Sequence, residues 1–402
     1  MTQLTVVFLI TAYILLHHGM SKARNAYCSG TDYSDGEWVR EEENTQSDNF
    51  DECTDLEDAA RNHLKVKIEG GNVEVNSKYC NNSIDHPPLV MDNAWKCKMT
   101  FYYWGETSLS ASNVTFYPKS IKYKWNPSQC QLKDWNPADF CNLLNSRTVL
   151  FVGDSTVYQT AMTLKAMVYY HYASVGNLKE SCHRNIYFEM SDRLVNRPKT
   201  NYGRGGGLTV FDAVSKHNFK VNFLILSTGY HVHPRDADVG VNVTDEAYAD
   251  SFFPVLNAEI RHVVYQLRKR LVDFKIIYKT ENVGHTGCQE FTGPDNALNQ
   301  VDRLVALNAF NKYKWNYEIE TQTRFIRFAH NHDIDIIRMH PLYSRPDGHI
   351  ITKGLGIDCL HYCAPGPLNI FSRLFYHYLF MGDKWRDGEN YTEPLYPYVW
   401  SP

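Results

Sequence analysis

The chain has 402 residues, of which 43% are hydrophobic, 14% aromatic and 21% charged. This composition supplies ample apolar surface for a packed core, which excludes a globally disordered chain. The formal net charge of −4 gives none of the basic excess that a broad nucleic-acid-binding surface requires, so we expect no nucleic acid partner.

The N-terminus carries a nearly continuous apolar run from Leu4 to Leu16, followed by the small residues Ser21 and Ala23. A membrane-spanning helix needs about 20 apolar residues, whereas this run has the length of a signal-peptide core. We therefore predict a signal peptide over residues 1–23. The alternative is a short uncleaved anchor, the one case in which we expect a membrane association. Either segment would bring the chain into the secretory pathway.

Ten cysteines are present, and an even number in an oxidising compartment favours disulfides. A structural zinc site would need two close pairs, but Cys359 and Cys363 form one pair without a second. We therefore predict structural disulfides and no metal. Residues 24–146 combine cysteines with many Asn, Asp, Ser and Tyr residues and show little helical periodicity. They predict a Cys-rich, loop-rich N-terminal subdomain.

From residue 147 onward, short apolar runs alternate with helical stretches. The runs predict strands at 148–152, 221–226, 275–278 and 334–337, and the helices are expected at 157–171, 249–272 and 297–330. This alternation predicts an α/β fold, a doubly wound parallel sheet with helices on both faces, over residues 147–380. Further strands are expected near 186–189 and 208–211, and an aromatic C-terminal tail over 381–402.

Gly153-Asp154-Ser155 stands between the first of these strands and its helix, where backbone N–H groups can stabilise an oxyanion. A serine nucleophile needs a base that a third group orients. Asp358 and His361 can supply both, because a carboxylate bonded to Nδ1 leaves Nε2 facing the serine. Each motif alone is weak evidence, and their combination carries the prediction.

Other histidines follow predicted strands. His349 is the rival base, although the preceding Asp-Gly is typical of a turn. His231 and His233 alternate, which favours a polar pair at the site rim over a metal site that would lack a third ligand. His285 would either line the acceptor site or cap a loop. The glycine-rich segment 203–207 lacks the Lys-Ser/Thr of a phosphate loop and predicts a flexible loop.

The Gly-Asp-Ser and Asp-x-x-His motifs, in this order, resemble the SGNH (GDSL) hydrolase superfamily. Residues 123–132, 344–349 and 358–366 resemble motif blocks of the trichome-birefringence-like and PC-esterase proteins, and 35–39 resembles their N-terminal Gly-x-Trp-Val element. The resemblance spans residues 35 to about 380. It implies a three-layer SGNH-type fold and an O-acetyltransferase or O-acetyl esterase acting on glycans. Animal relatives include neurexophilin-like proteins.

The resemblance implies a Golgi-lumenal or extracellular enzyme that needs no cofactor and uses an acetyl donor as co-substrate and a glycan as partner. Ser155 would be the nucleophile, His361 the base and Asp358 the group that orients it. Backbone N–H groups of Ser155 and Gly229 would form the oxyanion hole. The predicted substrate-binding residues are Asp154, Tyr158, Gln159, His231 and His285.

The chain departs from the plant pattern at Tyr158 and Gln159, where the plant proteins carry Arg-Asn. Residues 227–231 likewise read Ser-Thr-Gly-Tyr-His in place of Asn-Thr-Gly-His. The alternative hypothesis is therefore a secreted binding protein that keeps the fold and has lost turnover. Transfer and hydrolysis stay open, since they differ in whether a sugar hydroxyl or water reaches the acyl-enzyme. Disulfides of Cys359 and Cys363, with partners unassigned, are expected to pin the Asp-x-x-His segment.

Overall fold

The computed structural model describes residues 26–30, 32–40, 65–69, 72–76, 123–174, 177–195, 208–232, 245–271, 273–311, 315–352, 356–362 and 366–385. The predicted signal peptide, His233, Cys363, the glycine-rich segment 203–207 and the tail beyond residue 385 lie outside these ranges. Within them, no helix is both long and apolar enough to cross a bilayer.

The centre of the molecule is a parallel sheet of five strands. Their order across the sheet is β6 (Ile186–Met190), β5 (Val149–Gly153), β7 (Phe223–Ser227), β8 (Lys275–Lys279) and β9 (Asp335–Ile337). All four principal predicted strands and the extra strand near 186–189 are confirmed. The chain moves outward from β5 to β6, then returns to the other side of β5 with β7, so the winding direction changes between β5 and β7.

The second extra strand, predicted at 208–211, is wrong. These residues lead into the helix α7 (Val210–Lys216). Thr209 accepts a hydrogen bond from the backbone N–H of Asp212, and the Asp212 carboxylate accepts one from the backbone N–H of Thr209. This reciprocal capping box fixes a helix start and overrides the strand propensity of the short apolar run.

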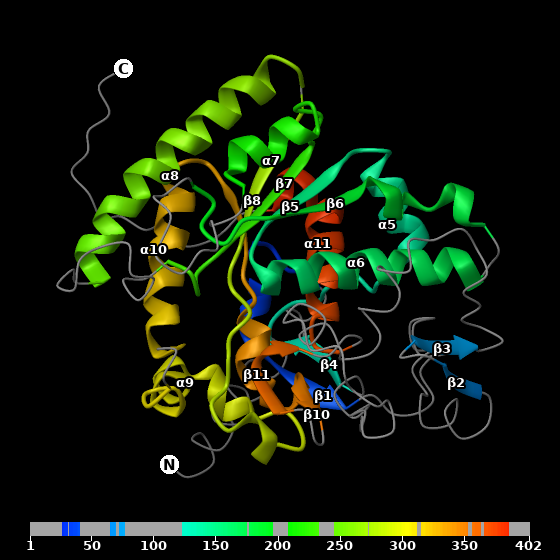
Figure 1. Cartoon of the computed structure of the whole chain (residues 1–402), viewed down its shortest axis with the longest axis vertical. Coiled ribbons are helices and arrows are strands. Elements are labelled where there is room, and N and C mark those ends of the chain that lie inside the picture. Colours follow the sequence, from blue (N-terminus) through cyan, green and yellow to red (C-terminus); the bar gives the residue numbers. More distant parts are fainter. Residues whose placement is uncertain are drawn as a thin grey trace, which may run out of the picture.

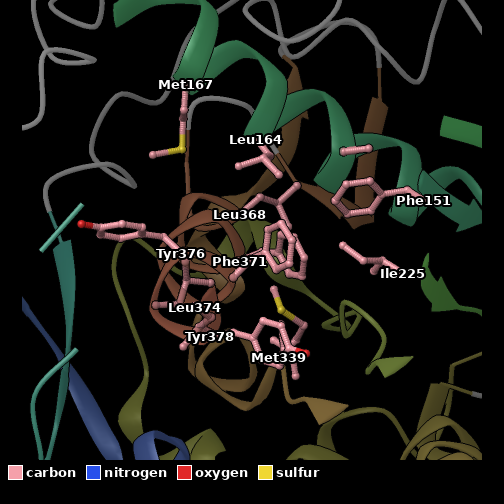
Figure 2. Close-up of a cluster of buried hydrophobic side chains, with 14 of the residues drawn as sticks. Phe151, Leu164, Met167, Ile225, Met339, Leu368, Phe371, Leu374, Tyr376 and Tyr378 are labelled. Atoms are coloured by element: carbon pink, nitrogen blue, oxygen red, sulfur yellow. The ribbon is translucent and has the colours of Figure 1, made fainter. Parts of the chain in front are cut away.

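One face of the sheet is covered by α5 (Pro137–Leu144), α6 (Ser155–Ser174) and α11 (Asn369–Met381) (Figure 1). Alternate strand residues such as Phe151 and Ile225 point to this face, where they are fully buried. Figure 2 shows them packed among side chains of α6 and α11. The ring of Phe151, for example, meets that of Phe371 at a centroid distance of 5.5 Å.

The opposite face is covered by α7, α8 (Asp245–Arg268) and α10 (Glu318–His330). Leu150 and Leu224, the neighbours of the residues on the first face, belong to this second core. The helix predicted over 297–330 is interrupted here. It consists of α9 (Val301–Leu307), the 3-10 turn η9 (Trp315–Tyr317) and α10. Helices thus flank the sheet on both sides, which confirms the doubly wound α/β architecture.

The segments 26–30, 32–40 and 123–146 pack against this domain and share its core. β1 (Gly36–Arg40) pairs antiparallel with β4 (Tyr123–Pro127), and Trp38 and Trp125 face each other across that pair. Both indoles lie in the same buried cluster as Phe151. A separate hairpin consists of β2 (Lys65–Glu69) and β3 (Asn72–Asn76).

Three disulfides connect described residues: Cys28–Cys130, Cys141–Cys182 and Cys288–Cys359. The first two tie the N-terminal segment together and join α5 to the segment before β6. The prediction of structural disulfides is thereby confirmed for six of the cysteines. The others, Cys53, Cys80, Cys97 and Cys363, lie outside the described residues.

Candidate active site

The turn from β5 to α6 places Ser155 at the carboxyl edge of the sheet, where its winding direction changes. Open α/β sheets bind ligands at this position. Ser155 is the first residue of α6 and is half-buried. Gly153 permits the close approach of β5 to β7, since a Cβ there would lie 2.2 Å from the carbonyl oxygen of Ser227. The Oδ1 atom of Asp154 accepts a 2.9 Å hydrogen bond from the N–H of Thr156 and thereby caps α6.

Asp358 and His361 lie on β11 (Gly356–Tyr362), which pairs antiparallel with β10 (His349–Thr352). The register shifts after the first residue of β10, so three residues of β11 bulge out of the ladder. Within this bulge, the Oδ1 atom of Asp358 accepts hydrogen bonds from the N–H groups of Leu360 and His361, at 3.0 and 3.1 Å. The bulge therefore folds the carboxylate back toward the imidazole.

The three predicted catalytic side chains form one continuous chain of hydrogen bonds. The Oγ atom of Ser155 lies 2.7 Å from Nε2 of His361, and Nδ1 of His361 lies 2.9 Å from Oδ2 of Asp358. The imidazole is 13% exposed and the carboxylate 22%, so the dyad lies beneath the surface but within reach of solvent. Burial alone would raise the pKa of Asp358, but hydrogen bonds and charge from His361 lower it to about 2.

Gln159, one turn along α6 from Ser155, binds the end of β11. Its Nε2 donates to the carbonyl oxygen of Tyr362 at 2.8 Å, and its Oε1 accepts the N–H of Tyr362 at 3.1 Å. The Gln159 side chain is 2% exposed. The Gln159 amide thus makes the two hydrogen bonds that the backbone of a neighbouring strand would make. It thereby holds β11 beside Ser155.

Two buried histidines link the backbone of Tyr343 to the backbone of His361. The Nδ1 atom of His285 lies 2.7 Å from Nε2 of His349, and Nε2 of His285 lies 2.7 Å from the carbonyl oxygen of Tyr343. His349 in turn places its Nδ1 atom 3.1 Å from the carbonyl oxygen of His361. Burial lowers the pKa of His285 to about 4 and that of His349 well below its ordinary value.

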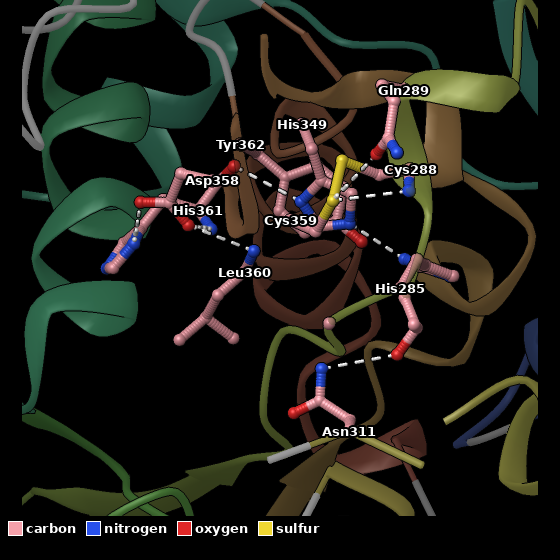
Figure 3. Close-up of a disulfide and its surroundings, with 12 residues drawn as sticks. His285, Cys288, Gln289, Asn311, His349, Asp358, Cys359, Leu360, His361 and Tyr362 are labelled. Atoms are coloured by element: carbon pink, nitrogen blue, oxygen red, sulfur yellow. Dashed lines mark hydrogen bonds and ion pairs between the residues drawn. A yellow bond between two sulfur atoms is a disulfide. The ribbon is translucent and has the colours of Figure 1, made fainter. Parts of the chain in front are cut away.

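The Cys288–Cys359 disulfide anchors the bulge of β11 to the segment that follows β8 (Figure 3). The adjacent backbone adds a second link, because the N–H of His285 donates to the carbonyl oxygen of Cys359 at 2.9 Å. The expectation that a Cys359 disulfide would hold the Asp-x-x-His segment is confirmed. Its partner is Cys288, which the sequence did not identify.

Three of the predicted substrate-binding residues face inward. Asp154 is 1%, Gln159 2% and His285 0% exposed. Their hydrogen bonds cap α6, hold β11 and bind the second histidine, respectively. In this geometry they hold neighbouring segments of the protein, and their role in substrate binding stays a prediction. Likewise His349, the rival base, is buried and has no contact with Ser155 among the hydrogen bonds of the described residues.

The remaining predicted site residues have different surroundings. Tyr158 is partly buried, with its ring 5.0 Å from that of Phe188. His231 is 39% exposed, and its Nε2 lies 4.0 Å from a carboxylate oxygen of Asp192. Gly229 follows β7 at the same sheet edge and is buried. The roles of Tyr158 and His231 in substrate binding and of Gly229 in the oxyanion hole stay predictions.

Sequence reasoning missed Glu281, a fully buried carboxyl at the same edge. Its two oxygens contact the hydroxyls of Ser227 and Thr156, at 2.7 and 2.9 Å. Glu281 lies three residues after the predicted third strand, so the rule that sites form at strand ends could have identified it. No group of three His, Cys, Asp or Glu residues suited to hold a metal occurs among the described residues.

Comparisons with known proteins give one informative relative. The protein named xyloglucan O-acetyltransferase 1, from Populus trichocarpa, is 22% identical over 307 residues, which are 63% of this chain and 70% of the relative. No family model matches the sequence. A solved structure aligns with 60% of this chain and 99% of its own, at 13% identity and a TM-score of 0.32, which is too low to support any argument. The first comparison supports a distant relationship to an acetyltransferase.

Proposed function

We propose that this chain is an SGNH-type enzyme of the secretory pathway that transfers or hydrolyses O-acetyl groups on glycan hydroxyls through an acyl-enzyme on Ser155. The observation that carries the proposal is the unbroken chain from Ser155 through His361 to Asp358. Such a chain activates a serine that is otherwise a poor nucleophile, because the imidazole accepts its proton.

In the first half-reaction, the Oγ atom of Ser155 attacks the acetyl carbonyl carbon while Nε2 of His361 takes the hydroxyl proton. The tetrahedral intermediate then expels the donor's leaving group, to which His361 returns the proton. In the second half-reaction, a sugar hydroxyl or water attacks the acetyl-serine and gives its proton to His361. Collapse of this second intermediate releases the acetylated sugar or acetate and restores the Ser155 hydroxyl.

The local electrostatics favour each charged species in this sequence. Asp358 is ionised at neutral pH and stabilises the imidazolium that forms when His361 accepts the proton. Ser155 begins the helix α6, so the developing oxyanion would lie near the positive end of the helix dipole. The backbone N–H groups of Ser155 and Gly229 are the proposed donors to this oxyanion.

The substrate class has separate support. The relative is named for O-acetyl transfer to xyloglucan, and the motif blocks of this chain resemble those of glycan-acetylating proteins. The disulfides favour an oxidising compartment such as the Golgi lumen or the cell exterior. We therefore propose a polysaccharide or glycan as acceptor and an acetylated compound as donor, with no further cofactor.

The decisive experiment incubates purified protein with an acetyl donor, with and without candidate glycans, and follows the acetyl group by mass spectrometry. Wild-type protein should form acetyl-Ser155 and pass the group to glycan or water, whereas Ser155→Ala should do neither. Ser215→Ala, on α7 at the opposite face of the sheet, is the matched control and should behave as wild type. Equal activity in Ser155→Ala would remove this residue from the mechanism.

The same material tests the alternative of an inactive binding protein, which the Tyr158 substitution motivates. A fluorophosphonate probe labels serines that an adjacent base activates. Labelling of Ser155 in correctly folded protein supports the enzyme. Absence of labelling, together with retained affinity for a glycan, would favour the binding protein.

A further inference from the structure

A cluster of buried ionisable groups lies directly behind the nucleophile turn and has no part in the mechanism above. Asp154 precedes Ser155. Lys279 is the last residue of β8, Glu281 lies two residues further on, and Glu318 begins α10. Each of these four residues is at most 5% exposed. Three carboxyls and one ammonium group share this region, so at least one carboxyl is expected to be neutral.

The hydrogen bonds identify the carboxyl that holds a proton. The Oγ1 atom of Thr156 lies 2.7 Å from Oδ1 of Asp154 and 2.9 Å from Oε2 of Glu281. One threonine hydroxyl has a single proton, so it can donate to one of these oxygens and must accept from the other. The second contact is therefore a hydrogen bond when one of the two carboxyls is protonated.

Asp154 is the better acceptor of the two. Its Oδ1 atom already acts as an acceptor, since it accepts the N–H of Thr156 as the cap of α6. Glu281 receives a hydroxyl hydrogen bond at its other oxygen, from Ser227 at 2.7 Å. We therefore favour the arrangement in which Ser227 donates to Oε1 of Glu281, Oε2–H of Glu281 donates to Thr156, and Thr156 donates to Asp154.

We propose that Glu281 is the carboxyl of this cluster that carries a proton and that it acts as a positioning residue, joining the Ser155 turn to the loop after β7. This inference rests on the proposed function for its catalytic consequence. Thr156 is the neighbour of the nucleophile, and Ser227 lies two residues before Gly229, the proposed oxyanion donor. Glu281 thus bridges the two segments from which the oxyanion hole would be built.

Gly229 packs tightly against the side chains of Glu281 and Glu318. A Cβ at Gly229 would lie 1.9 Å from Oε1 of Glu318 and 2.8 Å from Cγ of Glu281. The loop therefore rests directly on the two glutamates. A negative charge on Glu281 would place two carboxylates around Thr156 and turn a cooperative hydrogen bond into a repulsive contact.

The groups that face Glu281 from all neighbouring elements agree with a neutral carboxyl. Burial and then the charge of Asp154 raise its pKa to about 7, against the opposing influence of Lys279 and of the hydroxyls. Burial and the charges of Glu281 and Asp154 also raise the pKa of Glu318 well above its ordinary value. Two buried phenols, Tyr230 and Tyr278, complete the charged and titratable surroundings.

Glu281→Gln and Glu281→Ala separate the proton from the side chain. The glutamine amide accepts from Ser227 and donates to Thr156, as the protonated acid does, whereas alanine can do neither. Glu320→Gln, at a position whose side chain is 57% exposed on α10, is the matched control. Thermal unfolding of each variant shows whether the protein is folded.

Two measurements on these proteins decide the inference. The infrared difference spectrum between wild type and Glu281→Gln at about pH 6, below the pKa of about 7, should contain a carboxylic-acid carbonyl band. Fluorophosphonate labelling of Ser155 should keep its rate within about threefold in Glu281→Gln and slow by about tenfold or more in folded Glu281→Ala, because a displaced nucleophile reacts slowly. Glu320→Gln should change neither.

The outcomes separate the two proposals. Wild-type protein that neither labels nor transfers acetyl groups contradicts the proposed enzyme, while the infrared spectrum still decides whether Glu281 carries a proton. A carboxylate band in place of the acid band overturns the protonation. Folded Glu281→Ala that labels as fast as wild type overturns the positioning role. Slow labelling of Glu281→Gln would show that the hydrogen-bond arrangement assigned above is wrong.

Discussion

Gln159 and Tyr362 are joined by a pair of hydrogen bonds, with Nε2 of Gln159 donating to the Tyr362 carbonyl oxygen at 2.8 Å and the Tyr362 N–H donating to Oε1 at 3.1 Å. Gln159 lies one helical turn after Ser155, and Tyr362 directly follows His361. The pair therefore connects α6, which carries Ser155, to β11, which carries His361. No other amide in the described part of α6 makes such a pair with β11.

Gln159→Ala should lower kcat by about tenfold or more, because small displacements of a base from its nucleophile are costly. Substrate affinity should change little, since the side chain is buried. Steady-state kinetics on an acetyl ester separate the two parameters. Gln159→Glu should be as damaging, because a carboxylate cannot donate to the Tyr362 carbonyl. Gln266→Ala, on the partly exposed side of α8, is the control; a change in KM alone for Gln159→Ala would return this residue to substrate binding.

Asp358→Asn should reduce kcat by about 10³–10⁴-fold, since the amide favours the wrong tautomer of His361. The wild-type carboxyl has a pKa of about 2, so it stays ionised throughout the pH range in which the protein is folded and assayed. Any loss of wild-type activity between about pH 6 and pH 4 must then have another origin. Infrared difference spectra between wild type and Asp358→Asn at about pH 4 check this, and a protonated carboxyl assigned to Asp358 would contradict the assignment.

The strands and the hydrogen-bonded arrangement of Ser155, His361 and Asp358 were predictable because each has a local signal. Buried parallel strands such as β5 and β7 consist of continuous apolar runs, and the strand-end rule directs attention to Ser155. The three-residue spacing of Asp358 and His361 then suggests an oriented base. In the structure, a bulge in β11 brings these two residues together.

What the sequence could not show was the direction of polar side chains near the site. Gln159 lies four residues after Ser155 in the sequence, and His285 lies beside His349 in the structure. Both side chains are buried and hydrogen-bonded within the protein. The packing of α6, β8 and β11 decides whether such a side chain points toward Ser155 or into the protein interior. The role of Glu281 was hidden for the same reason, because its two hydroxyl partners, Thr156 and Ser227, come from two other segments of the chain.

The buried imidazole of His285 predicts a loss of folding stability in acid. Burial lowers the pKa of His285 from 6.5 to about 4, so the unfolded chain binds a proton in this interval that the folded chain does not. The associated stability is fully present above about pH 6.5 and is lost as the pH falls toward 4, by up to about 3 kcal/mol.

Denaturant unfolding at about pH 7 and about pH 4.5 measures this loss. His285→Gln should be less stable than wild type at pH 7 but should lose less stability on acidification, since glutamine does not titrate. His332→Gln is a suitable control, because this histidine lies at the end of α10, in a partly exposed position. A pH dependence in His285→Gln identical to that of wild type would show that His285 is not the responsible group.

The Cys288–Cys359 disulfide should matter more for activity than the other two. Cys288→Ser with Cys359→Ser should cost about 2–4 kcal/mol of unfolding free energy and also lower kcat, because Cys359 lies between Asp358 and His361. Cys141→Ser with Cys182→Ser should cost comparable stability with much less effect on the kcat of folded protein. Equal effects of the two double variants on kcat would mean that the disulfide near the triad acts through global stability alone.

Gly153→Ala tests the close packing that presents Ser155. The added Cβ would lie 2.2 Å from the backbone carbonyl oxygen of Ser227, and a backbone atom between two central strands cannot move away without separating them. We expect a loss of about 1–3 kcal/mol in stability and a reduced rate of Ser155 labelling in the protein that still folds. Gly293→Ala is the matched control, because its nearest neighbour is the end of the Tyr123 side chain at 3.1 Å. Thermal unfolding and probe labelling should therefore distinguish the two substitutions, and equal behaviour would show that the β5–β7 contact is looser than its geometry implies.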